Sequence, residues 1–210
     1  TWPGHLALKL SPEIFSYFSN QVKERIILIA GTNGKTTTSL MIRSVLTKKG
    51  KKVIHNDSGA NLLNGLVSAF ILKSNLLGKI DADYAIFEVD EATLAHILPY
   101  FCHAEFISAS SRKILKRVQD DKAGKKLVVV LLNLFRDQLD RYGEVDTIAR
   151  KWNETLEKLA SETILILNAD DPQISELGAG KKAKTVYFGL EDKNLYLKNK
   201  EHATDSTFCL

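Results

Sequence analysis

RIILIAGTNGKTTT, residues 25–38, is the stretch that decides the fold of this 210-residue chain. It begins with a continuous apolar run, which is typical of a strand buried on both faces of a parallel sheet. A glycine-containing loop and then a helical pattern follow the run directly. Glycines let such a loop fold with its backbone N–H groups facing inward, and the helix N-terminus adds partial positive charge. The stretch therefore predicts a phosphate-binding loop within an α/β fold.

Two side chains of this loop have predicted roles in phosphate and metal binding. Lys35 can reach the β and γ phosphates of a nucleotide, and the Thr36 hydroxyl can bind Mg²⁺. The general loop pattern carries a further glycine upstream of Gly34, where this chain has Ile29, so the loop is a shortened variant. We prefer this interpretation to a plain glycine turn followed by a surface lysine.

Short apolar runs alternate with helical patterns along the rest of the chain. We expect strands at Arg25–Ala30, Lys52–His55, Tyr84–Glu88, Leu127–Leu132, Thr163–Leu167 and Thr185–Phe188. We expect helices at Lys35–Lys49, Asn61–Leu72, Glu91–Leu98 and Val145–Ala160, and a further helix that begins at Ser11-Pro12-Glu13. This order predicts an α/β fold with a mostly parallel sheet flanked by helices on both faces.

Two of these helices have predicted apolar faces, and we expect that of the second in the core. The face of the first consists of Leu40, Met41, Val45 and Leu46. The face of the second consists of Ile148, Trp152, Leu156 and Leu159. Apolar residues at this spacing are typical of helices packed on a sheet rather than of a cofactor site.

The composition excludes several classes of protein. With 44% hydrophobic and 26% charged residues, the chain can bury a sizeable core and is not disordered as a whole. Its two cysteines, Cys102 and Cys209, form no CxxC pattern, which excludes a disulfide-rich secreted scaffold and suits a reducing compartment. No apolar run approaches the ~20 residues that span a bilayer, and we expect no signal peptide and a cytoplasmic location.

The net charge of +4 comes from one segment. Between Phe101 and Lys126 there are seven Lys/Arg and three Asp/Glu residues, so the remainder of the chain is formally neutral. No aromatic residue interleaves the basic run from Arg112 onward, which favours a solvated loop or helix over a nucleic-acid site. A connection of this length between a helix and a strand is uncommon in a compact domain.

Polar residues follow several predicted strands where each strand ends: Asn56, Glu88, Asn133 and Asn168. Open α/β sheets bind ligands outside the carboxyl ends of their strands. A carboxylate such as Glu88 can there hold a metal ion that bridges ATP phosphate and substrate. Asp90 stands where the cap of the next helix is expected, so capping is its predicted role. The five histidines show no ligand-pair spacing, which argues against a histidine-based metal site.

The motif GTNGKTTT (31–38) resembles the ATP-binding loop of the Mur ligase superfamily. Further motifs resemble the MurT family within it: NDSGANLLNG (56–65), FEVDEAT (87–93), LFRDQLDRYGEVD (134–146) and NADDP (168–172). The motif at 134–146 is the most selective of these. The resemblance extends over most of the chain outside residues 101–126.

This resemblance implies an ATP-dependent amide ligase of peptidoglycan synthesis that uses Mg²⁺. MurT-type enzymes phosphorylate the α-carboxylate of D-glutamate in the lipid II stem peptide. Ammonia released from glutamine by a GatD-type amidotransferase then displaces phosphate and leaves D-isoglutamine. The implied partners are a GatD-type subunit and lipid II, at the cytoplasmic surface of a bacterial membrane.

The same motifs imply the site residues. Lys35 and Glu88 would be catalytic, and Thr36 and Glu88 would bind Mg²⁺. The residues implied in ATP binding are Gly31, Thr32, Asn33, Gly34, Lys35, Thr36, Thr37, Asn168 and Asp171. Gln138 stands where many Mur ligases have a metal-binding histidine, which leaves that contact open, and no position matches their carbamylated lysine.

Compared with the domain organisation of the MurT family, we expect residues 1–210 to form the central ATP-binding domain, without the family's zinc ribbon and C-terminal domain. Residues 101–126 resemble an inserted translated repeat element, or else are a lineage-specific loop. Cys209 falls where the first ribbon cysteine stands, and one cysteine cannot close a tetrahedral site, so Zn²⁺ is expected only with a complete ribbon. We expect the 210-residue chain by itself to bind Mg-ATP without amidating lipid II.

Two other interpretations stay open. One is a fragment of another Mur-type or cyanophycin-type ligase, which the motif at 134–146 disfavours. The other is a non-catalytic nucleotide-binding remnant.

Overall fold

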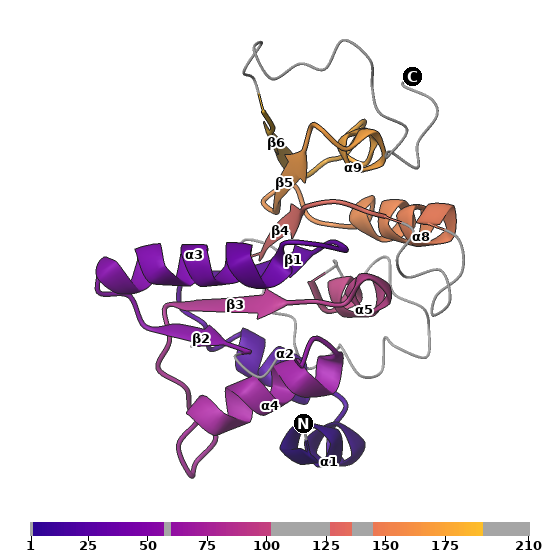
Figure 1. Ribbon diagram of the computed structural model, residues 1–210. Helices are drawn as coiled ribbons and strands as arrows, with labels where there is room; N and C mark the ends of the chain where they lie inside the picture. The colour runs from indigo at the N-terminus through magenta and orange to yellow at the C-terminus, as the bar shows by residue number, and fades with distance from the viewer. Residues whose placement is uncertain (1, 57–59, 102–126, 136–144, 191–210) are drawn as a thin grey trace.

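The computed structural model describes the protein over residues 2–56, 60–101, 127–135 and 145–190 (Figure 1). Its strands are β1 (Arg25–Ala30), β2 (Val53–His55), β3 (Tyr84–Glu88), β4 (Leu127–Leu131), β5 (Ile164–Asn168) and β6 (Lys184–Phe188). Its helices are α1 (Trp2–Leu10), α2 (Ile14–Ser19), α3 (Lys35–Lys48), α4 (Leu63–Lys73), α5 (Glu91–Ile97), the 3-10 helix η1 (Leu98–Phe101), α8 (Val145–Leu156) and α9 (Pro172–Glu176).

The strands of the described ranges form one six-stranded sheet in the order β2-β3-β1-β4-β5-β6. All neighbouring strands are parallel. The predicted α/β fold is therefore confirmed, and each expected strand is present with ends that differ by no more than one residue. The chain adds β2 and β3 on one side of β1 and β4 to β6 on the other, so the carboxyl end of β1 lies where ligands bind in such sheets.

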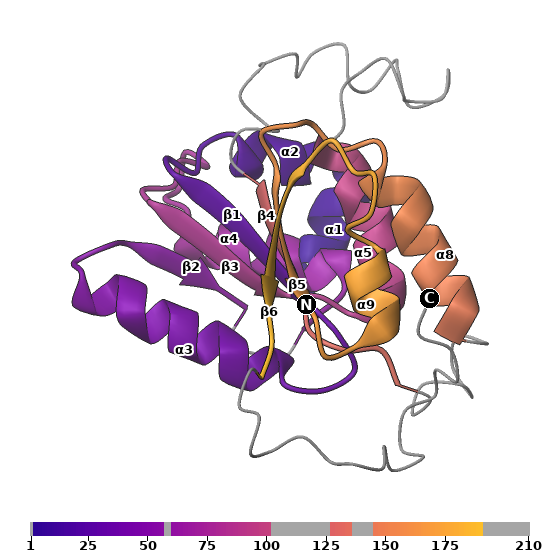
Figure 2. The same cartoon turned by 90° about the horizontal axis from the view of Figure 1, so that it is seen from above.

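The apolar residues of the strands divide between two clusters, one on each face of the sheet. The larger cluster joins the sheet to α2, α4, α5, α8 and α9. It includes Trp152 and Leu156 from the predicted apolar face of α8, which confirms that prediction. The smaller cluster is joined by Ile42 and Leu46 of α3, the helix that lies on this face of the sheet (Figure 2). Burial on both faces explains why the strands read as continuous apolar runs.

Most of the predicted apolar face of α3 is exposed. Leu40, Met41 and Val45 are 47%, 65% and 55% exposed, and Leu46 of the predicted set is the one that packs toward the sheet. Among the described helices, α3 covers its face of the sheet without a helical neighbour (Figure 2). Only one narrow stripe of it is therefore in contact with apolar residues.

The N-terminal region also differs from the prediction. Helix α2 begins at Ile14 rather than at Ser11-Pro12-Glu13, and Glu13 at its N-cap makes no side-chain capping bond. The preceding helix α1 was not predicted. It packs on α4, where the backbone N–H of Gly4 donates to Ser68 Oγ at 2.9 Å. A Cβ on Gly4 would lie 1.9 Å from Asn64 O, so this close approach of two helices requires glycine.

The predicted insertion at 101–126 lies outside the described residues, except for its first residue. Phe101 ends η1, is buried, and makes an edge-to-face contact with Phe15 at 6.0 Å between ring centroids. The core therefore extends one residue further than the sequence indicated. No helix of the described ranges is long and apolar enough to cross a membrane.

Candidate functional site

The loop between β1 and α3 has the backbone of a phosphate-binding loop. Gly31 and Gly34 adopt φ angles of 144° and 85°, a region that favours glycine. Gly34 is the N-cap of α3, and Lys35 is its first residue. A Cβ on Gly31 would lie 3.0 Å from the backbone N and O of Asn133. Both glycines are thus required by the path of the loop.

Asn133, just beyond the end of β4, anchors this loop. Its Oδ1 accepts from the backbone N–H of Asn33 at 2.8 Å, and its Nδ2 donates to Asn33 O at 3.1 Å. The backbone N–H of Thr32 donates to Asn133 O at 3.0 Å, and Thr32 Oγ1 accepts from the backbone N–H of Phe135 at 2.9 Å. Thr32 and Asn33 therefore fix the loop to the segment after β4, an anchoring role that the sequence did not reveal.

Lys35 is held by a buried carboxylate. Its Nζ donates to Glu91 Oε1 at 3.0 Å, to Thr32 O at 3.2 Å and to Gly31 O. The side chains of Lys35 and Glu91 are 15% and 1% exposed. Glu91 begins α5, and its backbone carbonyl accepts from Trp152 Nε1 at 2.8 Å, which ties the pair to α8. Glu91 was not among the predicted site residues, because its contact with Lys35 depends on how α5 lies against α3.

Glu88, at the end of β3, meets the first turn of α3. Its Oε2 accepts from the Thr36 hydroxyl at 2.7 Å, and its Oε1 accepts from the Ser39 hydroxyl at 2.7 Å. The structure thus brings together the three side chains that were predicted to act on phosphate and metal, Lys35, Thr36 and Glu88. Ser39 was not predicted, and it lies one helical turn beyond Thr36.

The backbone of Glu88 is held from the neighbouring strand. Asn56 follows β2; its Oδ1 accepts from the backbone N–H of Glu88 at 3.0 Å, and its Nδ2 donates to Glu88 O at 2.9 Å. Asn56 Nδ2 also lies 3.1 Å from Ala60 O. His55 Nε2 lies 3.8 Å from Glu88 Oε1, with both side chains buried.

Thr36 Oγ1 and Glu88 Oε2 offer a pair of oxygens that fits a hard cation. Mg²⁺ is usually held by one or two protein oxygens, with water and substrate phosphates as its other ligands. The described ranges contain no group of three or more His, Cys, Asp or Glu residues that could hold a metal ion by themselves. The residues present therefore fit Mg²⁺ carried with a nucleotide better than a metal caged by the protein. Gln138 and Cys209 lie outside the described residues.

The remaining predicted site residues lie along the same end of the sheet. Thr37 is exposed in the first turn of α3. Asn168 Nδ2 donates to Leu132 O at 2.8 Å. Asp171 caps α9 by accepting from the backbone N–H of Ile174 at 3.1 Å, and it also accepts from that of Leu134 at 2.9 Å. Asn168 and Asp171 thus serve local structure, and their predicted contacts with a nucleotide stay predictions. The predicted cap is confirmed at Asp90, whose side chain accepts from Ala92 N and Thr93 N.

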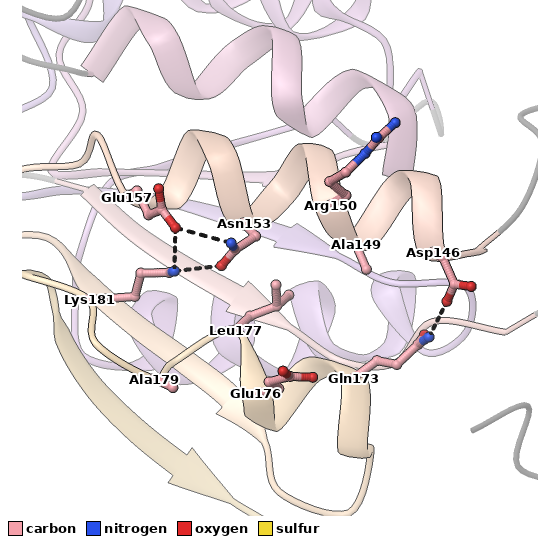
Figure 3. Close-up of a pocket in the computed structure, with 10 residues that line it drawn as sticks. All are labelled: Asp146, Ala149, Arg150, Asn153, Glu157, Gln173, Glu176, Leu177, Ala179 and Lys181. Carbon is pink, nitrogen blue, oxygen red and sulfur yellow. Dashed lines mark hydrogen bonds and ion pairs between the residues drawn. The ribbon is translucent and has the colours of Figure 1, made fainter. Parts of the chain in front are cut away.

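A separate pocket of about 510 Å³ lies between α8 and α9 (Figure 3). Gln173 Nε2 donates to Asp146 Oδ1 at one end of it. At the other end, Lys181 Nζ donates to Asn153 Oδ1 at 2.5 Å. Its lining includes none of the loop residues, so it is distinct from the site around Lys35.

Comparison with known proteins adds an independent finding. The model of the Mur ligase middle domain matches residues 29–209. The lipid II isoglutaminyl synthase (glutamine-hydrolyzing) subunit MurT of Staphylococcus aureus is 35% identical over 189 residues, which are 90% of this chain and 36% of that relative. The subunit of the same name from Streptococcus pneumoniae is 31% identical over 82% of this chain and 32% of its own length. This chain therefore spans well under half of these relatives.

Solved structures agree on the fold. MurF from Acinetobacter baumannii superposes with a TM-score of 0.60 and 20% sequence identity, over 84% of this chain and 34% of that one. At this identity the likeness concerns the fold alone. It is consistent with the parallel sheet and the placement of the loop after β1.

Proposed function

The chain belongs to the Mur ligase family through its ATP-binding middle domain, and on that premise we propose that the site around Lys35 binds Mg-ATP for amide formation. The observation that carries the proposal is that Lys35 and Thr36 begin α3 directly after the glycine loop, where Thr36 bonds to Glu88 at the end of β3. The loop and the N-terminus of α3 supply positive potential for phosphate. Lys35 adds a charged donor, and Thr36 and Glu88 supply the oxygens for Mg²⁺.

The charges of the site argue that the metal is needed for nucleotide binding. The site holds two buried carboxylates: Glu91 is paired with the ammonium of Lys35, whereas Glu88 accepts from the hydroxyls of Thr36 and Ser39. Negative phosphates entering alone would meet this excess of negative charge, which buried surroundings screen poorly. A divalent cation bound with the phosphates offsets it. We therefore expect ATP to bind much more tightly with Mg²⁺ than without it.

The MurT relatives point to the substrate. Their printed name describes a glutamine-hydrolysing lipid II isoglutaminyl synthase. On this basis the proposed reaction is transfer of the γ-phosphoryl group to the α-carboxylate of D-glutamate in lipid II, followed by attack of ammonia. A carboxylate is a poor electrophile, and the acyl phosphate provides a leaving group. The ammonia would come from a GatD-type partner, at the cytoplasmic surface of the membrane.

Within this reaction the described residues have limited and definite tasks. Lys35 would hold and neutralise the phosphoryl group in transfer, an electrostatic stabilisation that is large in a site shielded from water. The glycine loop would orient the phosphates, and orientation of the reacting groups is itself a major part of catalysis. Mg²⁺, when bound with ATP, would spread the developing negative charge.

Calorimetry tests the nucleotide site. Titration of the chain with Mg-ATP should give binding that falls strongly in the absence of Mg²⁺ and in the variant Lys35→Ala. A charged hydrogen bond contributes about 1.5–3 kcal/mol, so we expect at least a tenfold loss of affinity. Equal affinity of the wild type and the variant would contradict the assignment of the loop.

The finer function needs a separate assay. The chain, in its complete protein context with a GatD-type subunit, glutamine and Mg-ATP, should convert lipid II to the amidated form, which mass spectrometry detects by the change from carboxylate to amide. Transfer to another acceptor, with lipid II left unchanged, would contradict the proposed substrate while leaving the nucleotide site in place.

A further inference from the structure

We propose that Ser39 and Asn56 are positioning residues that make Glu88 a metal ligand through one oxygen, Oε2. The inference rests on the proposed function, because it takes Glu88 as a ligand of the Mg²⁺ bound with ATP. It goes further in assigning different tasks to the two carboxylate oxygens of Glu88, and in naming the two residues that enforce the division.

Two hydroxyls of α3 divide the carboxylate between them. Thr36 Oγ1 lies 2.7 Å from Oε2, and Ser39 Oγ lies 2.7 Å from Oε1. Ser39 Oγ also lies 2.9 Å from Thr36 O. Its single proton can serve one acceptor at a time, and the charged oxygen of Glu88 is the stronger acceptor. Each oxygen of Glu88 therefore has its own hydroxyl, Oε2 that of the predicted Mg²⁺ ligand Thr36 and Oε1 that of Ser39.

The two carboxylate oxygens of Glu88 also differ in how buried their neighbours are. Ser39 is fully buried, and His55, the other group near Oε1, is buried as well. Thr36, which meets Oε2, is exposed at the start of α3 next to the glycine loop. Oε2 and Thr36 Oγ1 thus form the accessible side of the pair, where phosphates held by the loop would lie.

Asn56 holds the other end of the same residue. Its side-chain amide bonds to both the N–H and the carbonyl of Glu88, at 3.0 and 2.9 Å, and so extends the pairing of β2 with β3 beyond His55. Asn56 is 2% exposed, so water cannot easily replace these bonds. The bonds from Asn56 to the backbone and from Ser39 to Oε1 therefore restrain the rotation of the Glu88 carboxylate.

A fixed single oxygen favours Mg²⁺ over larger ions. Mg²⁺ demands a nearly ideal octahedron, whereas Ca²⁺ accepts carboxylates through one or both oxygens in a flexible shell. The hydrogen bond from Ser39 keeps Oε1 away from the metal, and so disfavours a bidentate arrangement. Loss of that bond should therefore weaken Mg²⁺ and help Ca²⁺, a pattern that general destabilisation of the fold would not produce.

The experiment measures ATP binding to the full chain by calorimetry while Mg²⁺ or Ca²⁺ is varied. In Ser39→Ala we expect the Mg²⁺ concentration for half-maximal binding to rise about tenfold, the usual effect of losing a hydrogen bond to a metal ligand. The ratio of Ca²⁺- to Mg²⁺-supported affinity should rise, and binding of ATP without metal should not change. Ser39→Cys fills the site with a slightly larger group that is a much weaker donor, and serves if Ser39→Ala folds poorly.

Ser68→Ala is the matched control. Ser68 is a buried serine of α4 whose Oγ accepts from Gly4 N and donates to Asn64 O, away from Glu88. It should lower stability without changing the metal dependence. Asn56→Asp should raise the Mg²⁺ requirement as Ser39→Ala does, because it loses the donor to Glu88 O.

The outcomes separate the inference from its premise. Metal-dependent ATP binding in the wild type, with Ser39→Ala behaving like Ser68→Ala, would overturn the role of Ser39 and leave the nucleotide site standing. If ATP binding to the wild type did not depend on either Mg²⁺ or Ca²⁺, the proposed Mg²⁺ site and this inference would both be overturned. The inference would be supported if the Ser39 variants needed more Mg²⁺ and showed a higher ratio of Ca²⁺- to Mg²⁺-supported ATP affinity, while Ser68→Ala showed neither change.

Discussion

The two ends of the parallel sheet hold their charged side chains in opposite ways. At the carboxyl end, Glu88 and Glu91 are buried, and each bonds to a fixed partner at 2.7–3.0 Å. At the amino end, Lys23 and Lys52 both donate to Asp81, and these three side chains are 56–63% exposed. The charged groups at the carboxyl end are buried and hydrogen-bonded, whereas those at the amino end form an exposed network.

This difference shows where a single substitution matters. Exposed ion pairs are screened by water and salt and contribute little. Buried carboxylates need their partners, because an unpaired charge in the interior is strongly destabilising. The residues that would act on ATP are thus the same residues whose loss also disturbs the fold.

The largest effect is expected for Lys35→Ala, which leaves Glu91 buried without its cation. Breaking a buried pair costs about 3–5 kcal/mol, so the free energy of unfolding in urea should fall by about 3 kcal/mol, and Mg-ATP binding should be lost with it. Lys23→Ala, the exposed counterpart, should change neither quantity appreciably. Comparable losses of stability in the two variants would erase the contrast between the ends of the sheet.

The double variant Lys35→Met/Glu91→Gln separates stability from binding. It removes both charges and keeps similar volumes, which is often neutral for stability. We expect the unfolding free energy to recover while Mg-ATP binding stays absent. If binding also recovered, Lys35 would be a structural partner of Glu91 and not a phosphate ligand.

The next largest effect concerns the connection that precedes β4. Replacing residues 102–126 by a short linker should leave stability and Mg-ATP binding close to those of the wild type, because the cost of loop closure grows slowly with length. Removing Phe101 as well should lower the unfolding free energy by about 3 kcal/mol, because its ring packs on Phe15. A large fall in melting temperature for the first deletion would show that the replaced segment belongs to the core.

Glycine substitutions give a smaller contrast of the same kind. Gly31→Ala should cost about 2 kcal/mol, since the new Cβ lies 3.0 Å from the backbone of Asn133 and the φ angle is 144°. Gly50 has a φ of 74° with open space around it, so Gly50→Ala should cost only about 1 kcal/mol of backbone strain. Only Gly31→Ala should also weaken Mg-ATP binding. Equal costs, measured by chemical denaturation, would mean that the loop can move away from Asn133.

Local signals in the sequence predicted most of the fold. Strands buried on both faces leave continuous apolar runs, and these located all six strands of the described ranges within a residue. Helix α1 was missed because its cause is tertiary: Gly4 is favourable there only because α4 approaches with Ser68 and Asn64. The exposure of Met41 was missed for a similar reason, since helical periodicity does not tell how much of a helix is covered.

The residues of the candidate site also fall into those that local sequence signals predicted and those that depend on tertiary packing. The spacing of the loop placed Lys35 and Thr36, and the end of a strand placed Glu88. Their partners Glu91 and Ser39 could not be predicted, because those contacts depend on how α5 and α3 lie against the sheet. A motif fixes which groups can act, whereas the packing of helices decides which groups hold them.

The smallest effect is expected at the amino end on acidification. Hydrogen bonds from Lys23 and then Lys52 lower the pKa of Asp81 from 3.8 to about 2. A carboxyl group whose pKa is lower in the folded state stabilises the fold above its unfolded pKa, and this contribution is lost as the pH falls from about 4 to about 2. Because the side chains are exposed, the loss should be small, and 1 M salt, with a Debye length of about 3 Å, should reduce it further.

Urea titrations of the wild type and Asp81→Asn between pH 6 and 2 should therefore give slightly different free energies of unfolding at low salt and equal ones in 1 M salt. The Mg-ATP affinity at neutral pH should be equal in both proteins. A change in that affinity for Asp81→Asn would mean that the two ends of the sheet are coupled, and the contrast between them would no longer hold.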